Sequence, residues 1–236
     1  VPTAFDGFKI TQVTDLHDAE FGENHKRLIK KVKATNPDAI FITGDVIDSR
    51  RYNLEQSLRA VEQLTAIAPV YYVLGNHEVA TNEPTVIYDA LRRLGVRVLA
   101  NESILLEREG EKIAIAGIED PLLGMEVSKM IERATEKVNE DTLTVMLSHR
   151  PERFEEYVEG NLDLILTGHA HGGQIRIPFI GGLVAPTQGW MPKYTAGRFE
   201  ELNTTMIVGR GLGNSLFPFR IFNLPEIITV ELKTKK

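Results

Sequence analysis

The chain of 236 residues contains no cysteine, which excludes both a disulfide framework and a metal site built from thiolates. Its composition, with 42% hydrophobic and 25% charged residues, is ordinary for a globular protein and provides for a sizeable core. A formal net charge of -6 disfavours binding to the backbone of long nucleic acids, and no apolar run approaches the ~18 residues that span a bilayer.

In the first part of the chain, short apolar runs alternate with amphipathic stretches. The runs are rich in branched and aromatic residues and end in glycine or polar turns, as strands do. The stretches between them repeat apolar residues every three or four positions, which is typical of helices. The predicted strands are residues 8–14, 39–44 and 70–75, and the predicted helices are residues 24–35, 54–67 and 82–95. This rhythm predicts parallel, buried strands.

After Gly95 the predicted strands become shorter, and from Gly172 the chain is rich in glycine and proline. We find no internal repeat, low-complexity segment or linker. The further predicted strands are residues 96–100, 103–109, 112–118, 143–149, 163–169 and 225–232, with helices at 125–138 and 151–158. We expect a single domain, residues 1–236, with a sheet large enough to split into two packed layers.

Polar residues gather at the ends of these predicted strands. Five of the six histidines lie there, and His25, at the start of a predicted helix, is the exception. Because functional groups collect at the carboxyl ends of parallel strands, we expect side chains that are distant in the sequence to meet there. The residues concerned are Asp15, His17, Asp45, Asp48, Asn76, His77, His149, His169 and His171.

These side chains offer oxygen and imidazole nitrogen donors, a set that suits Mn, Fe, Zn and similar divalent ions. The spacing of Asp15 and His17, and of His169 and His171, puts both members of each pair on one side of an extended segment. There are more donors than one ion needs, which indicates two ions. Each piece alone is also typical of a turn or of a structural histidine. Five such pieces at strand ends favour a metal site.

The order D-x-H, G-D-x-x-D, G-N-H-E, H and G-H-x-H resembles the calcineurin-like metallophosphoesterase superfamily. The stretches SHRPERF (148–154) and TGHAHGGQIRIPFIGGL (167–183) are similar to the bacterial YkuE-like branch, which also has members similar to UDP-diacylglucosamine pyrophosphatases. The resemblance covers about residues 8 to 230. It implies an α/β fold, a four-layer α-β-β-α sandwich of two mixed sheets flanked by helices.

The resemblance also implies a role for each residue of the motif. Asp45 would bridge two metal ions, together with a water or hydroxide. His77 would lie just outside the metal ligands and face the phosphate, and Asp48 would hydrogen-bond and orient His77. One ion would be held by Asp15, His17 and His171, and the other by Asn76, His149 and His169.

The implied activity is hydrolysis of phosphodiester or pyrophosphate bonds by attack of the metal-bridging hydroxide, with Mn²⁺ as the first choice of metal and Fe, Zn, Ni or Co as alternatives. His77 would stabilise the developing charge or protonate the leaving group. Gly44, Gly75 and Gly168 are expected to let the backbone turn sharply beside the ions. A phosphomonoesterase or protein phosphatase with the same metal core is the runner-up. A non-catalytic metal-dependent scaffold ranks last, because no ligand position is replaced.

Many relatives carry an arginine that binds phosphate directly after the G-D-x-x-D block, where this chain has Ser49. Arg50 and Arg51 follow, and Arg50 is a candidate for binding the substrate phosphate. Asp18 and Glu20 are interpreted as loop carboxylates rather than ligands.

The last third of the chain carries the only tryptophan, Trp190, and several phenylalanines. These residues form either part of the core or an apolar rim that accepts a lipid or touches a membrane surface. Arg210 and Arg220 are candidates for binding a second phosphate or a headgroup. We expect a phosphoester substrate of modest size, lipid- or nucleotide-linked. The chain begins without methionine, and a preceding signal or anchor would place the protein in a bacterial cell envelope; a cytoplasmic location is the alternative.

Overall fold

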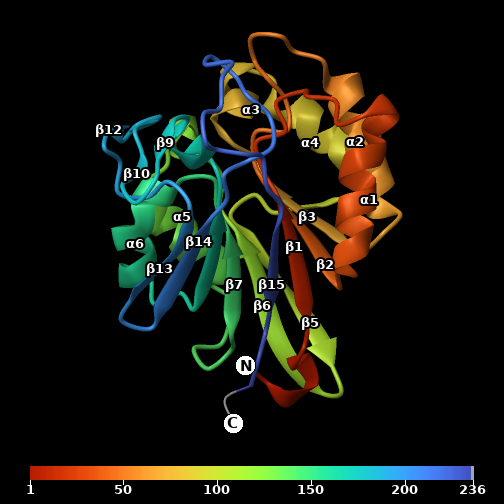
Figure 1. Ribbon diagram of the computed structural model, residues 1–236. Coiled ribbons are helices and arrows are strands. Elements are labelled where there is room, and N and C mark those ends of the chain that lie inside the picture. Colours follow the sequence, from red (N-terminus) through yellow and green to blue (C-terminus); the bar gives the residue numbers. More distant parts are fainter. Residues whose placement is uncertain (235–236) are drawn as a thin grey trace.

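The apolar runs of the sequence form two mixed β-sheets that pack face to face in the computed structural model, which describes residues 1–234 (Figure 1). The first sheet has the order β15-β1-β2-β3-β4. Its strands β1 to β4 pair in parallel, as predicted, and β15 pairs antiparallel with β1. The bounds are β1 Lys9–Val13, β2 Ala39–Thr43, β3 Val70–Val73, β4 Arg97–Val98 and β15 Ile228–Glu231.

The second sheet has the order β13-β14-β8-β7-β6-β5. Its inner strands β14, β8, β7 and β6 are parallel, and the two edge strands run antiparallel to them. The bounds are β5 Glu102–Arg108, β6 Glu111–Gly117, β7 Thr144–Leu147, β8 Leu164–Thr167, β13 Gly197–Glu201 and β14 Thr204–Val208.

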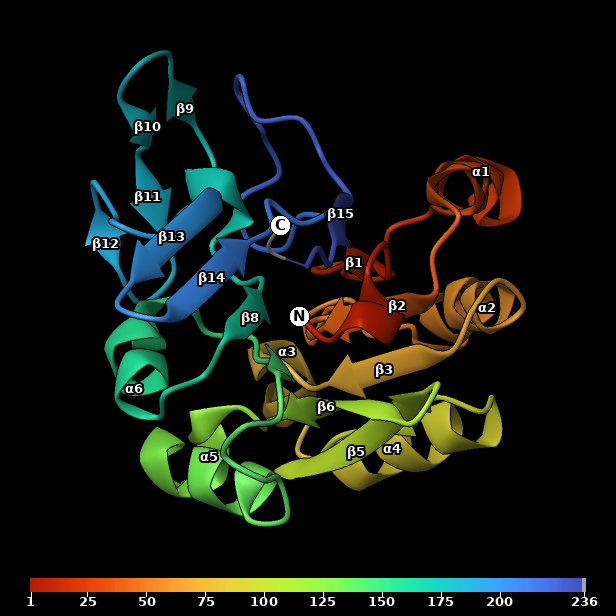
Figure 2. The ribbon, with the colours of Figure 1, turned by 90° about the horizontal axis from the view of Figure 1, so that it is seen from below.

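Helices cover the outer face of each sheet (Figure 2). One core cluster joins α1, α2 and α4 to the first sheet, and another joins α5 and α6 to the second. A third cluster, with Phe41, Tyr71 and Leu166 among its members, fills the space between the sheets. The helices are α1 Lys26–Thr35, α2 Leu54–Thr65, α3 Asn76–Ala80, α4 Pro84–Arg93, α5 Val127–Thr135 and α6 Phe154–Glu159. The four-layer arrangement of two mixed sheets flanked by helices is confirmed.

Three features depart from the sequence predictions. Helix α3 was not predicted, because its five residues are too few to show a helical repeat of apolar positions. The glycine-rich segment forms two small hairpins, β9 Arg176–Ile177 with β10 Gly181–Gly182 and β11 Val184–Ala185 with β12 Gly189–Trp190. Short 3₁₀ turns occur at Thr3–Phe5, Glu23–His25, Pro121–Leu123, Pro151–Arg153 and His171–Gly173.

Candidate metal centre

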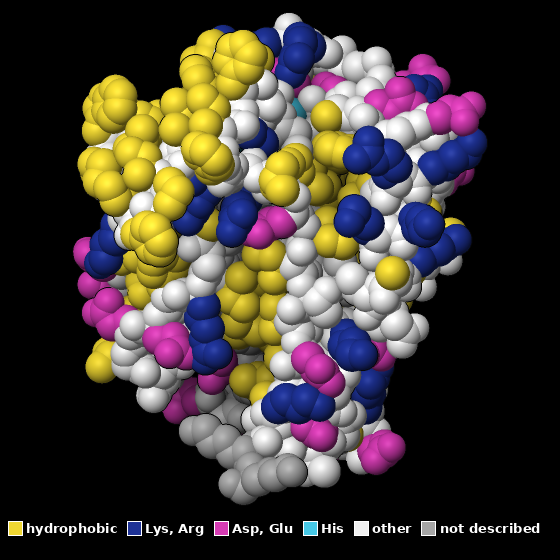
Figure 3. All heavy atoms as spheres, in the orientation of Figure 1, with side chains coloured by type: hydrophobic (Ala, Val, Ile, Leu, Met, Phe, Trp, Pro, Cys, Tyr) yellow, Lys and Arg dark blue, Asp and Glu magenta, His cyan; other side chains and the backbone are white. Residues whose placement is uncertain are grey.

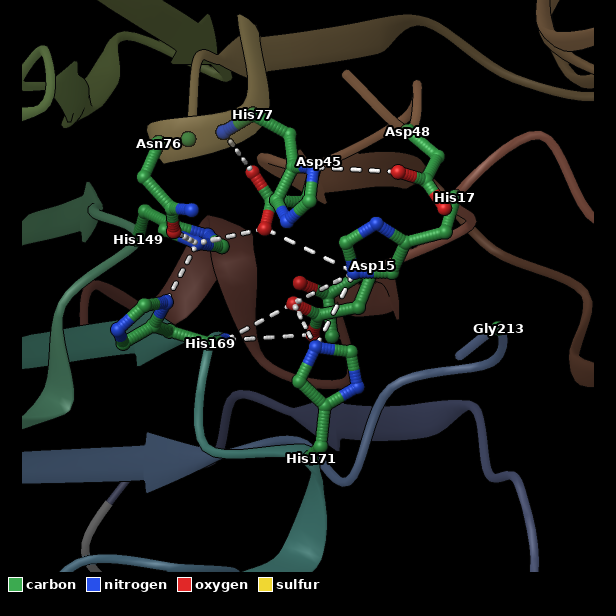
Figure 4. A network of polar contacts seen from close by, with 12 residues as sticks. Asp15, His17, Asp45, Asp48, Asn76, His77, His149, His169, His171 and Gly213 are labelled. Atoms are coloured by element: carbon green, nitrogen blue, oxygen red, sulfur yellow. Dashed lines mark hydrogen bonds and ion pairs between the residues drawn. The ribbon is translucent and has the colours of Figure 1, made fainter. Parts of the chain in front are cut away.

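The carboxyl ends of the parallel strands of both sheets meet at one edge of the sandwich. Gln12 ties the sheets together there, because its Nε2 donates to Thr43 Oγ1 and to the Thr167 carbonyl, both at 2.8 Å. Nδ1 of His149 in turn lies 2.8 Å from the Thr43 carbonyl. The predicted metal ligands, together with Asp48 and His77, follow these strand ends and come together in a single cluster (Figure 4).

The backbone bends back at the residues that carry the cluster. Five of them adopt positive φ although none is glycine, a conformation that costs on the order of 1 kcal/mol or more per residue. Hydrogen bonds hold the bends: Asp15 N–H donates to the Gly44 carbonyl at 3.1 Å, and His17 N–H to the Asp45 carbonyl at 3.0 Å. The five are Asp15, His17, Asp45, His169 and His171, with φ of 51°, 50°, 52°, 66° and 48°.

The first group of converging donors consists of Asp15, His17, Asp45 and His171, all buried, with one ligand atom of each within 4.8 Å of the others. Nε2 of His17 lies 3.1 Å from Nε2 of His171 and 3.7 Å from Asp45 Oδ2. Nε2 of His171 lies 3.6 Å from Asp15 Oδ1. Two carboxylates and two imidazoles therefore surround one point.

The second group consists of Asp45, His149 and His169, and shares Asp45 with the first. Nε2 of His149 lies 3.2 Å from Asp45 Oδ2, 3.1 Å from Asn76 Oδ1 and 3.1 Å from Nδ1 of His169. The Thr43 carbonyl accepts from Nδ1 of His149, which leaves Nε2 as the ring atom that faces the group. Asp45 thus stands between two sets of donors.

The charge states fit divalent cations at both groups. Burial lowers the pKa of His17 and His169 well below the usual range and also lowers the pKa of His171, so these rings are neutral and carry a lone pair. Nδ1 of His17 is buried without a hydrogen-bond partner. Burial opposes a charge on His149 as well, but the Asp45 carboxylate outweighs it and raises the pKa of His149 to about 10. A proton on His149 and a divalent cation would therefore compete for the place beside Asp45.

His77 lies beside these groups, with its ring edge against the ring of His17 at 4.6 Å between centroids. Nδ1 of His77 accepts from the backbone N–H of Ser49 at 3.1 Å and lies 3.0 Å from the Ser49 hydroxyl. Asp48 Oδ1 is 3.6 Å from Nδ1, beyond hydrogen-bond distance. Ser49 therefore makes the direct contacts that the sequence analysis assigned to Asp48.

The Asp48 carboxylate is engaged mainly by the residues that follow it. Nε and Nη2 of Arg51 donate to Asp48 Oδ2 at 3.0 and 2.8 Å, and the Arg50 backbone N–H donates to Oδ1. Arg51, and not Arg50, lies in the lining of the pocket next to His17. Asp18 accepts from the backbone N–H groups of Asp48 and Asn53, which fits the loop role predicted for it.

The glycines of the motif allow the chain to turn and also allow the ligand carboxylates to lie close to the backbone. Gly44 has a positive φ of 92°, as a sharp turn requires. Gly75 and Gly168 do not have positive φ, but the chain turns beside both: Gly75 is the N-cap of α3, and the Ala170 N–H donates to the Gly168 carbonyl at 2.7 Å. A Cβ at Gly75 would lie 2.3 Å from Asp45 Oδ1, and one at Gly168 would lie 2.7 Å from Asp15 Oδ2. Any side chain at these positions would occupy the space of a ligand.

Glu78 is a functional residue that the sequence analysis quoted in its motif without giving it a role. It is fully buried and accepts four backbone N–H groups, those of Asp45, Val46, Ile47 and Gly75, at 2.7 to 3.2 Å. It therefore ties the end of β3 to the loop that carries Asp45. Burial and the charge of Asp45 raise the pKa of Glu78 to about 7.

A second unpredicted contact is a buried ion pair between Arg150 and Asp120. Nε and Nη2 of Arg150 donate to the two carboxylate oxygens at 2.5 and 3.0 Å, and Nη1 lies 2.9 Å from Nε2 of His169. Arg150, held by Asp120, thus contacts the ring nitrogen of His169 that does not face His149. Only Arg150, directly after His149, carries a signal in the sequence, because Asp120 comes from a different loop.

The remaining predicted residues lie outside the two donor groups. Trp190 is exposed on β12, and Arg210 is half-buried, with its Nε 3.4 Å from Glu226 Oε2. Nη2 of Arg220 approaches Nδ1 of His171 at 3.4 Å. Arg220 is thus nearer to the metal-binding groups than the sequence alone indicated.

The sequence model of the calcineurin-like phosphoesterase family matches residues 8–173 of this chain. The chain is 31% identical to the uncharacterized metallophosphoesterase YkuE of Bacillus subtilis, over 99% of this chain and 82% of YkuE. It is 29% identical to the phosphodiesterase YaeI of Escherichia coli, over 95% of this chain and 82% of YaeI.

Among solved structures, TT1561 of Thermus thermophilus superimposes with a TM-score of 0.58. The alignment covers 87% of this chain and 90% of TT1561 at 12% sequence identity. This similarity supports the fold.

Proposed function

The chain belongs to the calcineurin-like phosphoesterase family, and from that premise we propose that its two donor groups hold two divalent cations and hydrolyse phosphodiesters or pyrophosphates of modest size. It is a metal-dependent phosphoester hydrolase. The name of YaeI, a phosphodiesterase, supports the choice of diesters. The observation that carries the proposal is the position of Asp45, whose carboxylate belongs to both groups.

Two cations at these groups would screen the charge of the phosphate and lower the pKa of a water between them. The residues of the chain prepare the site for this. Asp15, His17 and His171 would hold one cation, and Asn76, His149 and His169 the other, with Asp45 shared. Asn76 contributes a neutral amide oxygen, which limits the negative charge of the second group. Oxygen and imidazole nitrogen donors suit Mn²⁺ as well as Fe and Zn, and Mn²⁺ is our first choice among them.

His77 would act on the substrate directly. Its Nδ1 accepts the Ser49 N–H, so the ring proton sits on Nε2 and is free to be donated in a hydrogen bond. A hydrogen bond from Nε2 to the phosphate or to the leaving oxygen would stabilise the charge that develops there. Asp48 would assist through its negative charge at 3.6 Å and through its hold on Arg51.

Exposed apolar side chains support a lipid- or nucleotide-linked substrate and contact with a membrane surface. Trp190, Leu216 and Phe222 are each more than 70% exposed, and such apolar exposure is typical of an interaction surface. An envelope location would fit this surface. In the part of the chain that the structure describes, no helix has the length and apolar character needed to cross a bilayer.

The experiment compares hydrolysis of bis-p-nitrophenyl phosphate and p-nitrophenyl phosphate by metal-stripped protein refilled with Mn²⁺. We expect faster cleavage of the diester and its loss in the His149→Ala variant. Faster cleavage of the monoester would instead favour a phosphomonoesterase. Two bound metals with no turnover of either ester would favour the scaffold.

A further inference from the structure

Two pockets of similar size are lined by consecutive residues of one loop near the metal centre, and the second is much more apolar than the first. The loop comprises residues 212–220, and we call it the dividing loop. Asn214 and Ser215 line a pocket of about 510 Å³ together with His17; apolar side chains also line it, and we call it the polar pocket after its side chains Arg51, Asn53 and Gln56. The next residues, Leu216 and Phe217, line an apolar groove of about 550 Å³. Both volumes are in the range of small-molecule sites.

The polar pocket adjoins the first donor group through His17. Its opposite wall carries Arg51, Asn53 and Gln56, and the aromatic ring of Phe21 closes one side. Side-chain amides and a guanidinium bind hydroxyl and carbonyl groups well. Because Asp48 neutralises Arg51, the pocket suits a polar group without a strong net charge.

The apolar groove is lined almost wholly by apolar side chains. Leu183, Val184 and Trp190, from the β11–β12 hairpin and the residue before it, are among them. Apolar side chains gather over the β9–β12 hairpins at the upper left of the molecule, with arginine and lysine side chains beside them (Figure 3). A hydrocarbon chain that enters the groove is removed from water along most of its length.

The dividing loop is held beside the metal centre, because the backbone N–H groups of Leu212 and Gly213 donate to the carbonyls of Thr14 and Asp15 at 3.1 and 2.6 Å. Arg220 donates from Nε to Asn214 Oδ1 at 2.7 Å and from Nη2 to the Gly213 carbonyl at 2.5 Å, while Nη2 also approaches His171. Nη2 of Arg51 donates to the Asn214 carbonyl at 2.8 Å. His17 lines the polar pocket, and the apolar groove is lined by Gln174, three residues after His171, and by Leu216 and Phe217 of the dividing loop.

We propose that the substrate is an amphiphilic phosphodiester, whose polar alcohol enters the polar pocket and whose hydrocarbon chain enters the apolar groove; this rests on the function proposed above. In hydrolysis, a new bond forms between water oxygen and phosphorus, and the bond from phosphorus to the oxygen of the polar alcohol breaks. That alcohol leaves with a proton from the water. The alkyl phosphate remains with the hydrocarbon chain.

The first test uses alkyl p-nitrophenyl phosphates with one, four and eight carbons, kept below their micelle concentration, and the Mn²⁺-loaded protein. The ratio kcat/KM should rise with chain length, by up to about fourfold for each methylene group that is fully buried. Phe217→Ser should abolish this dependence. Phe179→Ser is the matched control: Phe179 is fully exposed on the same apolar surface but lines a different pocket, and this variant should keep the dependence.

The second test addresses the polar pocket with two substrates, the glycerol and the ethanol diesters of octyl phosphate. The product, octyl phosphate, is measured by phosphorus NMR. The glycerol diester should be preferred, and Gln56→Leu should reduce that preference while the chain-length dependence stays.

The proposal would be overturned if kcat/KM did not depend on chain length, or if Phe217→Ser and Phe179→Ser reduced the dependence equally. Either result would leave the proposed phosphodiesterase activity in place. If no ester is hydrolysed, the proposed function fails. Calorimetric binding of methylphosphonate and octylphosphonate still tests whether the groove binds a hydrocarbon chain. If octylphosphonate binds more tightly than methylphosphonate, and Phe217→Ser removes this difference, the groove binds the chain as proposed. Equal binding of the two phosphonates would contradict the proposal.

Discussion

His149 and Asp45 meet across the two sheets, with Nε2 of the histidine 3.2 Å from Oδ2 of the carboxylate. Asp45 follows β2 of the first sheet, and His149 follows β7 of the second. Because the contact joins the sheets at the point where both donor groups converge, the packing of the sandwich and the formation of the metal centre depend on each other.

The same contact predicts how the stability of the metal-free protein varies with pH. The pKa of His149 is raised in the folded state to about 10, against about 6.5 in the unfolded chain. A raised folded pKa stabilises the fold fully below pH 6.5, and this contribution is lost as the pH rises toward 10. Urea unfolding of metal-stripped protein should therefore show falling stability between pH 7 and pH 10. The His149→Gln variant should lose this slope, and an equal slope in both proteins would refute the assignment.

Replacing Glu78 by glutamine should weaken the hold on the Asp45 loop. In the wild-type protein both carboxylate oxygens of Glu78 accept backbone N–H groups. The amide nitrogen of glutamine cannot accept, so buried N–H groups would lose their acceptor, and an unsatisfied buried donor costs about 1–3 kcal/mol. We expect a lower melting temperature and weaker Mn²⁺ binding, measured by thermal unfolding and metal titration. Glu62→Gln, on the exposed side of α2, is the matched control and should change neither. Normal metal binding by Glu78→Gln would contradict this role.

Removing the Arg150 side chain should destabilise the protein strongly. Arg150→Met leaves Asp120 buried without its partner, and breaking such a pair costs about 3–5 kcal/mol. Chemical unfolding should show the loss. The comparison is Arg153→Met, which removes an exposed pair with Glu156 and should cost less than about 1 kcal/mol. Equal losses in the two variants would show that the Asp120 pair does not support the fold.

Much of the centre could be predicted because its residues follow strands that are simple apolar runs. The positions of Asp15, Asp45 and His149 depend only on where those strands end and on the edge at which the sheets meet. Contacts between loops left no such pattern. The partner of Arg150 is 30 residues away, and Glu78 acts on backbone groups that any sequence would supply.

The orientation of His77 shows a different limit of the sequence. Asp48 and Ser49 are neighbours, and which of them reaches the imidazole depends on backbone angles that a motif does not encode. The exposure of Leu216 and Phe217 is likewise a property of the fold, since the same residues in a sequence are equally typical of a core.

The most direct test of the central claim is the rate of bis-p-nitrophenyl phosphate cleavage against the number of Mn²⁺ equivalents added to metal-stripped protein. If Asp45 is shared by two cations, the protein binds two equivalents, and full activity requires the second. The Asp45→Asn variant should then bind both weakly and lose activity by about 100-fold or more, a loss of about 2.7 kcal/mol in the stabilisation of the transition state. Full activity at one equivalent, or an active Asp45→Asn variant, would contradict the two-metal account.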